Sequence, residues 1–248
     1  MSLKELPITG LPVGGVSPRV LVCGDPARAD RIAERLDDAT LLSHKREYRA
    51  HRGLFRGTPI TVCSHGIGAP GAAIAFEELI AAGARAIVRV GTCGGLQPDI
   101  LPGHLIVATA AVQNTGYGRE TVPPGYPAVA DPSLALALCR HAAGRPMQCG
   151  IVLTRDNFYA GVNISDAPDY RAMSAARVLA VEMECAAVFL VAALRGAQAG
   201  AILVVDGNVL ETAESMEGYH PGEEVVRAAV DAAITVGLEA LWEHTLPA

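Results

Sequence analysis

Short apolar runs alternate along the chain with longer segments in which apolar residues recur at helical spacing. The short runs end near Gly, Asp or Thr, which is typical of buried strands followed by turns. We expect strands at residues 20–23, 60–64, 86–90, 105–111, 151–154, 178–181 and 201–205, and helices at residues 72–82, 133–143, 185–195 and 223–244. This alternation predicts an α/β sandwich around a largely parallel or mixed sheet.

Residues 113–132 break the alternation, because this segment contains four Pro and three Gly. Such a composition is typical of a long surface loop, and we expect one here rather than a linker between domains. The chain has no internal repeat, and its 248 residues lie within the length of about 200–250 residues that one α/β domain commonly reaches. We therefore expect a single domain over residues 1–248.

Composition limits the core and the class of partner. Half of the residues are hydrophobic but only 4% are aromatic, so the core must be built mainly from closely packed Ala, Val, Leu and Ile. The net charge is −6 and no block of Lys or Arg occurs, which argues against nucleic acid as a partner. A few arginines directed into one cleft can still bind a small anion.

The six cysteines are scattered without a CxxC pair, and most lie within apolar runs. This pattern argues against a disulfide framework and against a zinc site, so we expect no metal. The N-terminal region lacks an apolar signal core, and the longest apolar stretch, residues 185–194, is too short to span a bilayer. We expect a cytoplasmic protein that does not interact with membranes.

The candidate chemistry lies where the predicted strands end. In α/β folds, ligands bind beside the loops that leave the carboxyl ends of the strands. Arginines, glycines, carboxylates and aromatic residues occupy these positions here: Gly24, Asp25, Pro26, Arg28, His65, Gly66, Arg89, Gly91, Thr92, Cys93, Gly94, Gly95, Arg155, Asp156, Asn157, Phe158, Tyr159, Glu182, Met183, Glu184, Asp206, Gly207 and Asn208.

Arg89 is the most unusual of these residues, because it lies inside an apolar run. An unpaired charge buried there would cost several kcal/mol, so Arg89 requires an anionic partner. One interpretation is a structural ion pair with a buried Glu. The other is a bound anion, since residues 91–95 that follow are small and expose backbone N–H groups. Together Arg89 and this segment make a candidate phosphate site.

Two further strand ends carry polar residues that fit a ligand site. Gly24 is followed by a helix start and Arg28, so free N–H groups and a guanidinium can meet one anion. An ordinary Asp-Pro helix start with a surface arginine is the alternative. Asp206 follows four apolar residues, where burial favours the protonated carboxyl that a general acid needs. The Asp-Gly pair at this point is equally typical of a plain turn.

Glu182 and Glu184 flank Met183, and in an extended strand both carboxylates face the same side, as binding of a sugar diol requires. If a helix starts at this point instead, the two carboxylates favour its positive end. Phe158 and Tyr159 can stack on a heterocyclic base or belong to the core.

Residues 66–71 match the dinucleotide fingerprint GxGxxG between a predicted strand and a helix. A dehydrogenase is therefore an alternative. However, the fingerprint also requires an acidic residue about 20 positions further on, at the end of the next strand, and this region contains Arg89 and Gly91 instead.

Seven motifs in order, GDPARADRIA, SHKREY, SHGIG, RVGTCGG, RDNFY, EMECAA and VVDGN, resemble the nucleoside phosphorylase family that contains hexameric purine nucleoside phosphorylases and uridine phosphorylases. The resemblance covers residues 20–240, and the VVDGN motif is most similar to purine nucleoside phosphorylases of parasitic protozoa. It implies a single-domain three-layer α/β/α sandwich around a mixed, partly barrel-like β-sheet. It also implies a homo-oligomer, at least a dimer and up to a hexamer, that acts on a nucleoside and inorganic phosphate without a cofactor.

The same resemblance assigns a role to individual residues. It implies a phosphate site of Gly24, Arg28, Arg89 and Thr92, completed by Arg46 from a neighbouring subunit. It implies that Met183 and Glu184 hold the ribose, that Cys93, Gly94 and Phe158 surround the base, and that Asp206 is the catalytic acid. The implied reaction is phosphorolysis of a nucleoside, with purine ribonucleosides favoured, to the free base and ribose 1-phosphate.

Two departures from the family pattern concern the sugar and the base. Members supply a His near the N-terminus to a neighbour's ribose, whereas the first His here is His44. The uridine branch carries a Gln and an Arg just after the Phe-Tyr pair to bind uracil, whereas residues 160–164 here are Ala-Gly-Val-Asn-Ile. A uridine phosphorylase remains the first alternative, followed by a hydrolytic nucleosidase and an NAD(P)-binding protein.

Overall fold

The apolar runs of the sequence form a ten-stranded mixed β-sheet. The computed structural model describes residues 4–159, 161–162, 167–211 and 224–246. The strands are β1 (Arg19–Cys23), β2 (Asp37–Lys45), β3 (Tyr48–Phe55), β4 (Thr58–Ser64), β5 (Ala86–Gly95), β6 (Leu105–Asn114), β7 (Ala128–Val129), β8 (Met147–Arg155), β9 (Ala180–Glu182) and β10 (Gln198–Asn208). All seven predicted strands are present, most of them longer than predicted.

Part of the sheet closes on itself. Strand β5 pairs in parallel with β1 and β10, and β10 continues through β6, β8 and β9 back to β5. The five strands β5, β10, β6, β8 and β9 therefore form a barrel, while β1, β4, β3 and β2 extend the sheet away from it. This arrangement confirms the mixed, partly barrel-like sheet.

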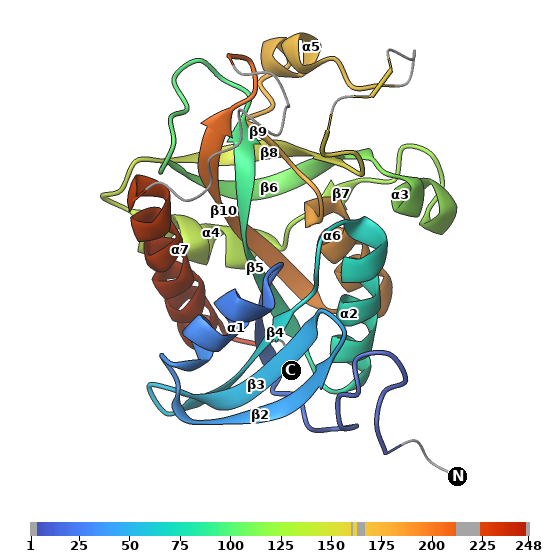
Figure 1. Ribbon diagram of the computed structural model, residues 1–248, viewed down its shortest axis with the longest axis vertical. Helices are drawn as coiled ribbons and strands as arrows, with labels where there is room; N and C mark the ends of the chain where they lie inside the picture. Colours follow the sequence, from blue (N-terminus) through green and yellow to red (C-terminus); the bar gives the residue numbers. More distant parts are fainter. Residues whose placement is uncertain (1–3, 160, 163–166, 212–223, 247–248) are drawn as a thin grey trace.

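Helices cover both faces of the sheet. They are α1 (Pro26–Ala33), α2 (Ala69–Ala81), α3 (Gly116–Thr121), α4 (Pro132–Ala142), α5 (Tyr170–Ala175), α6 (Cys185–Arg195) and α7 (Glu224–Glu243). Helices α2 and α6 lie together on one side of β5, and α1, α4 and α7 lie on the other (Figure 1). The three-layer α/β/α sandwich is therefore confirmed, and so are the four predicted helices.

The core follows from the shortage of aromatic residues. Phe76 and Phe189 are among the largest fully buried side chains, and Ala, Val, Leu and Ile make up most of the remaining core. Small side chains allow close packing of helix on sheet. At Gly237 of α7, a Cβ atom would lie 2.8 Å from Leu21 Cδ1 and 3.1 Å from Val90 Cγ2, so this helix can approach the sheet only with glycine at that position.

Three regions differ from the sequence prediction. Residues 113–132 are not one long loop, because β6 continues to Asn114, Thr115 caps the short helix α3, and β7 pairs with β6. Strand β2 was not predicted because most of its residues are exposed, so it lacks the alternation of a half-buried strand. Its partner strand β3 was not predicted either. Helix α5, which lies at the end of the molecule farthest from β2 and β3 (Figure 1), was not predicted either.

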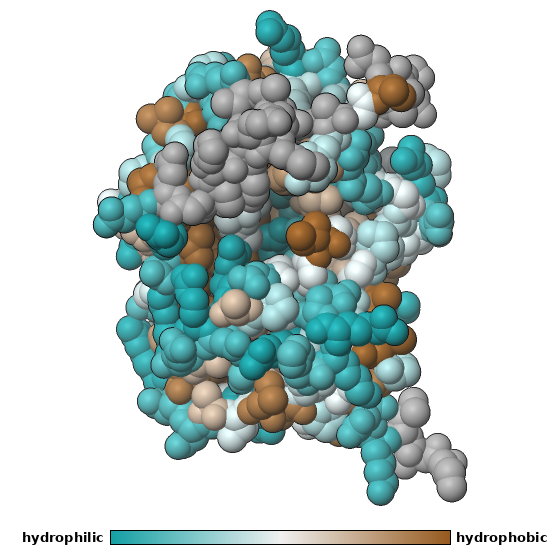
Figure 2. Space-filling view, viewed as in Figure 1, coloured by the Kyte–Doolittle hydropathy of each residue, from teal (hydrophilic) through white to brown (hydrophobic). Residues whose placement is uncertain are grey.

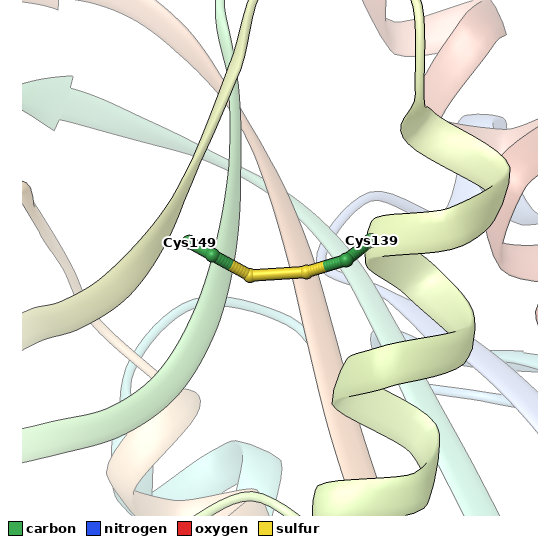
Figure 3. The surroundings of a disulfide bond; sticks show 2 residues. All are labelled: Cys139 and Cys149. Atoms are coloured by element: carbon green, nitrogen blue, oxygen red, sulfur yellow. A yellow bond between two sulfur atoms is a disulfide. The ribbon is translucent and has the colours of Figure 1, made fainter.

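The sequence argues against a disulfide framework, and the structure contains one disulfide, between Cys139 of α4 and Cys149 of β8, with 7.1 Å between their Cα atoms (Figure 3). The chain turns back between helix and strand, which brings two cysteines ten positions apart in sequence side by side. The scatter of cysteines along the chain gave no sign of this, because it contains no information about which elements become neighbours.

The surface has a mixed character. On the face shown in Figure 2, hydrophobic residues are scattered among hydrophilic ones and do not gather in one broad patch. Among the described residues, no helix combines the length and the apolar character needed to cross a membrane.

Candidate active site

A cavity of about 750 Å³ opens at the carboxyl ends of β1, β5, β8, β9 and β10. This is the edge of the sheet at which the sequence predicts a ligand site. Its lining includes every predicted site residue except Arg46, namely Gly24, Arg28, Arg89, Thr92, Cys93, Gly94, Phe158, Met183, Glu184 and Asp206. The fold therefore brings residues from five separate motifs to one cavity.

Arg89 lines the cavity and is buried, with a side-chain exposure of 4%. Its Nη2 atom contacts the Glu184 carboxylate and lies 3.2 Å from Glu182 Oε2. The ion pair with a buried Glu, one of the two predicted interpretations, is therefore present. However, Nε and Nη1 of Arg89 have no hydrogen-bond partner among the described residues. A buried donor without a partner is costly, so these two donors favour a bound anion in addition to the ion pair.

Gly91 provides the space that the Arg89 guanidinium occupies. A Cβ atom at this position would lie 2.6 Å from Arg89 Cζ and 2.9 Å from Nη2, and closer still to Nη1. Carbon atoms in ordinary contact are about 3.5–4.0 Å apart. Glycine at position 91 is therefore required for the Arg89 side chain to fold back over the backbone of its own strand.

The loop after β1 meets the loop after β4 beside this arginine. The Gly66 N–H donates to the Gly24 carbonyl at 3.0 Å, and a Cβ atom on Gly24 would lie 3.2 Å from Gly66 O. Asp25 caps α1 by accepting a hydrogen bond from the Ala27 N–H, and Arg28 lies in the first turn. Arg28 and Arg89 both line the cavity, so two guanidinium groups border the same space.

Two groups hold Glu184 as a carboxylate. It accepts a hydrogen bond from the Gly68 N–H at 2.6 Å and pairs with Arg89. Burial alone would raise the pKa of Glu184, but the charge of Arg89 and the Gly68 N–H outweigh burial and lower the pKa below its ordinary value. In the described structure, the glycine-rich segment that matches the dinucleotide fingerprint therefore donates to a carboxylate of this chain.

Glu182 does not share the position of Glu184. Its carboxylate accepts hydrogen bonds from the backbone N–H groups of Glu184 at 2.8 Å and Cys185 at 2.9 Å, and from the Thr154 hydroxyl at 2.5 Å. It therefore stabilises the start of α6, as predicted for the case in which a helix begins here. Binding of a sugar diol by the two carboxylates stays a prediction, and the Glu182 oxygens accept hydrogen bonds from the N-terminus of α6.

Asp206 lines the cavity further along β5 and β10 than Arg89 does. The pairing of β10 with β5 shifts register between Val205 and Gly207, so Asp206 lies in a bulge, a feature that redirects a side chain. Burial raises the pKa of the Cys93 thiol well above its ordinary value. The Cys93 thiol is therefore uncharged and lines the cavity near the carboxyl group of Asp206.

Phe158 and Tyr159 stack edge to face with ring centroids 5.1 Å apart. Only Phe158 lines the cavity, and its exposed fraction of 42% leaves a ring face accessible. Of the two aromatic candidates, Phe158 is thus the one that can stack on a ligand.

Arg46 lies outside this chain's own cavity. It is exposed in the tight turn between β2 and β3 and adopts a positive φ of 56°. Its expected contact with a neighbouring subunit stays a prediction.

Several residues that line the cavity were not assigned a role from the sequence: Glu47, Ile67, Arg155, Asn157, Tyr170, Val181 and Val209. Arg155 and Asn157 follow a strand and were among the strand-end residues. Tyr170 begins a helix that the pattern did not predict, so no strand-end signal was available for it.

Comparisons with known proteins agree with this geometry. The family model described as "Phosphorylase superfamily" matches residues 18–241. The chain is 38% identical to a uridine phosphorylase of Treponema pallidum, covering 90% of this chain and 91% of the relative. It is 38% identical to a guanosine phosphorylase of Halorubrum lacusprofundi, covering 92% and 94%. The solved structure of a purine nucleoside phosphorylase from Toxoplasma gondii in complex with immucillin-H is similar with a TM-score of 0.89 and 34% identity, covering 97% of this chain and 96% of that one. The chain belongs to the phosphorylase superfamily.

Proposed function

We propose that the protein catalyses phosphorolysis of nucleosides, with purine ribonucleosides as the favoured substrates, to the free base and ribose 1-phosphate. The observation that carries this proposal is one cavity whose lining includes three groups: the arginines Arg28 and Arg89, the Glu184 carboxylate that contacts Arg89, and Asp206 with Cys93, Gly94 and Phe158. These three regions match the three parts of the reactants: phosphate, sugar and base.

The part of the cavity lined by Arg28 and Arg89 binds inorganic phosphate in this proposal. Arg28 and Arg89 supply guanidinium groups, whose planar donors match phosphate oxygens, and Gly24 and Thr92 complete the lining. The unpartnered Nε and Nη1 donors of Arg89 gain partners when an anion binds. No cofactor takes part in this proposal, because phosphate is itself the second substrate.

The sugar and base regions supply the remaining roles. Glu184 is ionised and accepts hydrogen bonds from ribose hydroxyls, with Met183 packed against the sugar. A phosphate oxygen forms a bond to C1′ as the glycosidic bond breaks. Protonated Asp206 donates its proton to N7 of the leaving purine, so the base departs neutral; general acid catalysis of this kind contributes roughly 10²- to 10⁴-fold in rate. Phe158, Cys93 and Gly94 enclose the base.

The proposal includes a second subunit. Because Arg46 is exposed and lies outside its own chain's cavity, we assign it to the phosphate site of a neighbour. Each complete site then requires at least a dimer, and we propose a hexamer built from such dimers.

Uridine phosphorolysis is the second candidate, supported by the Treponema pallidum relative that bears this name. Asp206 is the residue that favours purines, since uracil has no N7 to protonate. The similar proteins include uridine phosphorylases as well as guanosine and purine nucleoside phosphorylases, so the preference for purines in this proposal depends on Asp206.

A substrate panel tests the proposal. The protein is incubated with inosine, adenosine, guanosine, uridine and methylthioadenosine, with and without phosphate, and the released bases are identified by chromatography. We expect base release that depends on phosphate and is fastest with a purine nucleoside. Equal release without phosphate would identify a hydrolase, and release from uridine alone would identify a uridine phosphorylase.

A further inference from the structure

Arg155 and Tyr170 form a polar pair in the wall of the cavity, and neither has a role in the reaction described above. Both residues line the cavity, Arg155 at the end of β8 and Tyr170 at the start of α5. The Arg155 guanidinium lies over the Tyr170 ring, with Cζ 5.4 Å from the ring centroid, and Nη1 hydrogen-bonds to the phenol oxygen. Two contacts to one side chain therefore fix the plane of the guanidinium.

Tyr170 lies close to residues of the proposed base region. Tyr170 packs with Val181 and Val209 in a small hydrophobic cluster that is separate from the main core. Val181 and Val209 also line the cavity, and Val209 lies against Gly94, where a Cβ atom would approach Val209 Cγ1 at 2.6 Å. Because Gly94 belongs to the proposed base region, Tyr170 and the guanidinium held against it belong to that region too.

An arginine at this position selects among bases by hydrogen-bond type. A guanidinium carries five donors and no acceptor, and it does not lose its charge in proteins. It therefore binds a base that presents a carbonyl oxygen and disfavours a base that presents an amino group in the same place. Hypoxanthine and guanine present O6 beside N7 on one edge, whereas adenine presents an amino group beside N7.

We propose that Arg155 is a specificity-determining residue that donates to the exocyclic carbonyl oxygen of the base, so the preferred substrates are 6-oxopurine nucleosides. The inference rests on the proposed function and adds the class of base to it. Asp206 donates to N7 and Arg155 to O6, the two neighbouring acceptors of one purine edge. Tyr170 is a positioning residue, because it orients the guanidinium through its ring and its phenol oxygen.

A purely structural role for Arg155 makes a different prediction. If the arginine only anchored α5 through Tyr170, its loss would weaken cleavage of all nucleosides by the same factor. Inosine and adenosine share the ribose and differ at C6, so the ratio of their kcat/KM values isolates the contact to the base.

The test measures kcat/KM for inosine, adenosine and uridine in the wild type and in Arg155→Met, Arg155→Lys and Tyr170→Phe. The wild type is expected to prefer inosine, and Arg155→Met to lower the inosine to adenosine ratio roughly 10- to 100-fold, the range for a lost charged hydrogen bond. Arg155→Lys should retain part of the preference, Tyr170→Phe should reduce it less than Arg155→Met, and the KM for phosphate should not change. The matched control is Arg171→Met, which removes an exposed arginine beside Tyr170 in α5.

An unchanged inosine to adenosine ratio in Arg155→Met, or a wild type that prefers adenosine, overturns the inference. Binding of free hypoxanthine and adenine, measured by calorimetry with the same proteins, provides a readout that does not depend on turnover. If no nucleoside is cleaved, the proposed function fails, and a hypoxanthine preference lost in Arg155→Met still supports the contact. Equal affinity of the wild type for the two bases overturns it.

Discussion

Gly91→Ala adds one methyl group to the backbone under the Arg89 guanidinium. The structure predicts that this methyl would lie 2.6 Å from Cζ, about 1 Å inside ordinary carbon contact. Gly91 does not require a positive φ, so the alanine backbone itself is unstrained and the effect is steric. The guanidinium must move by about 1 Å or more, which lengthens its 3.2 Å separation from Glu182 and disturbs its contact with Glu184.

The magnitude follows from the burial of this ion pair. Leaving buried carboxylates without their cation costs about 3–5 kcal/mol, an upper value here because the displaced guanidinium remains nearby. With a typical stability of about 5–15 kcal/mol, the variant should fold but unfold at lower urea concentration. Its KM for phosphate should rise roughly 10- to 100-fold, since one or two charged hydrogen bonds are lost.

Urea unfolding followed by circular dichroism gives the free energy, and initial rates at varied phosphate give KM. Gly116→Ala is the matched control, because the same methyl there lies 3.5 Å from its nearest neighbour, Asp156 Oδ2, at the start of α3. If Gly91→Ala changes the free energy of unfolding by less than about 0.5 kcal/mol and leaves the KM for phosphate unchanged, Gly91 is not required for the position of the Arg89 guanidinium.

Three further predictions concern the subunit contact, a buried histidine and the cysteines. Arg46→Met and Arg89→Met should each lose phosphorolysis, and co-expression should restore part of it, because a mixed dimer contains one site with both arginines; failure to restore activity would contradict a shared site. Burial lowers the pKa of His65 to about 4 from 6.5, so the unfolded state binds a proton at a higher pH than the folded state does. The free energy of unfolding in urea, measured for the wild type relative to His65→Gln, should therefore fall by about 2 kcal/mol between pH 7 and pH 5. A difference between the two proteins that stays constant over this range would contradict the lowered pKa. Titration of the unreduced, denatured protein should find four thiols, because the Cys139–Cys149 disulfide leaves four free cysteines; six would contradict the disulfide.

The sequence predicts most of the sheet because buried strands leave a strong apolar signal. Strand β5 is an example: its apolar residues predict the strand, and the polar residues after it predict the site. Strand β2 leaves no such signal, because most of its residues are exposed and it is held by pairing with β3. Its position is set by a partner strand, which the hydrophobic pattern of one segment does not reveal.

The residues of the candidate site can also be predicted from the sequence in part, whereas their contacts cannot. Strand-end position identifies Arg89, Glu184 and Asp206, since the carboxyl ends of strands meet at one place in this class of fold. Sequence position does not show which partner Arg89 contacts, and both predicted kinds of partner were consistent with an arginine in an apolar run. Tyr170 reaches the cavity from a helix far along the chain, so its role required the three-dimensional arrangement.

The most direct test of the central claim is phosphorus NMR of a reaction that contains inosine and inorganic phosphate. We expect the phosphate signal to decrease as a ribose 1-phosphate signal appears, with one hypoxanthine released for each phosphate consumed. The rate should fall roughly 10²- to 10⁴-fold in Asp206→Asn. Release of hypoxanthine with free ribose and unchanged phosphate, or full activity of Asp206→Asn, would contradict it.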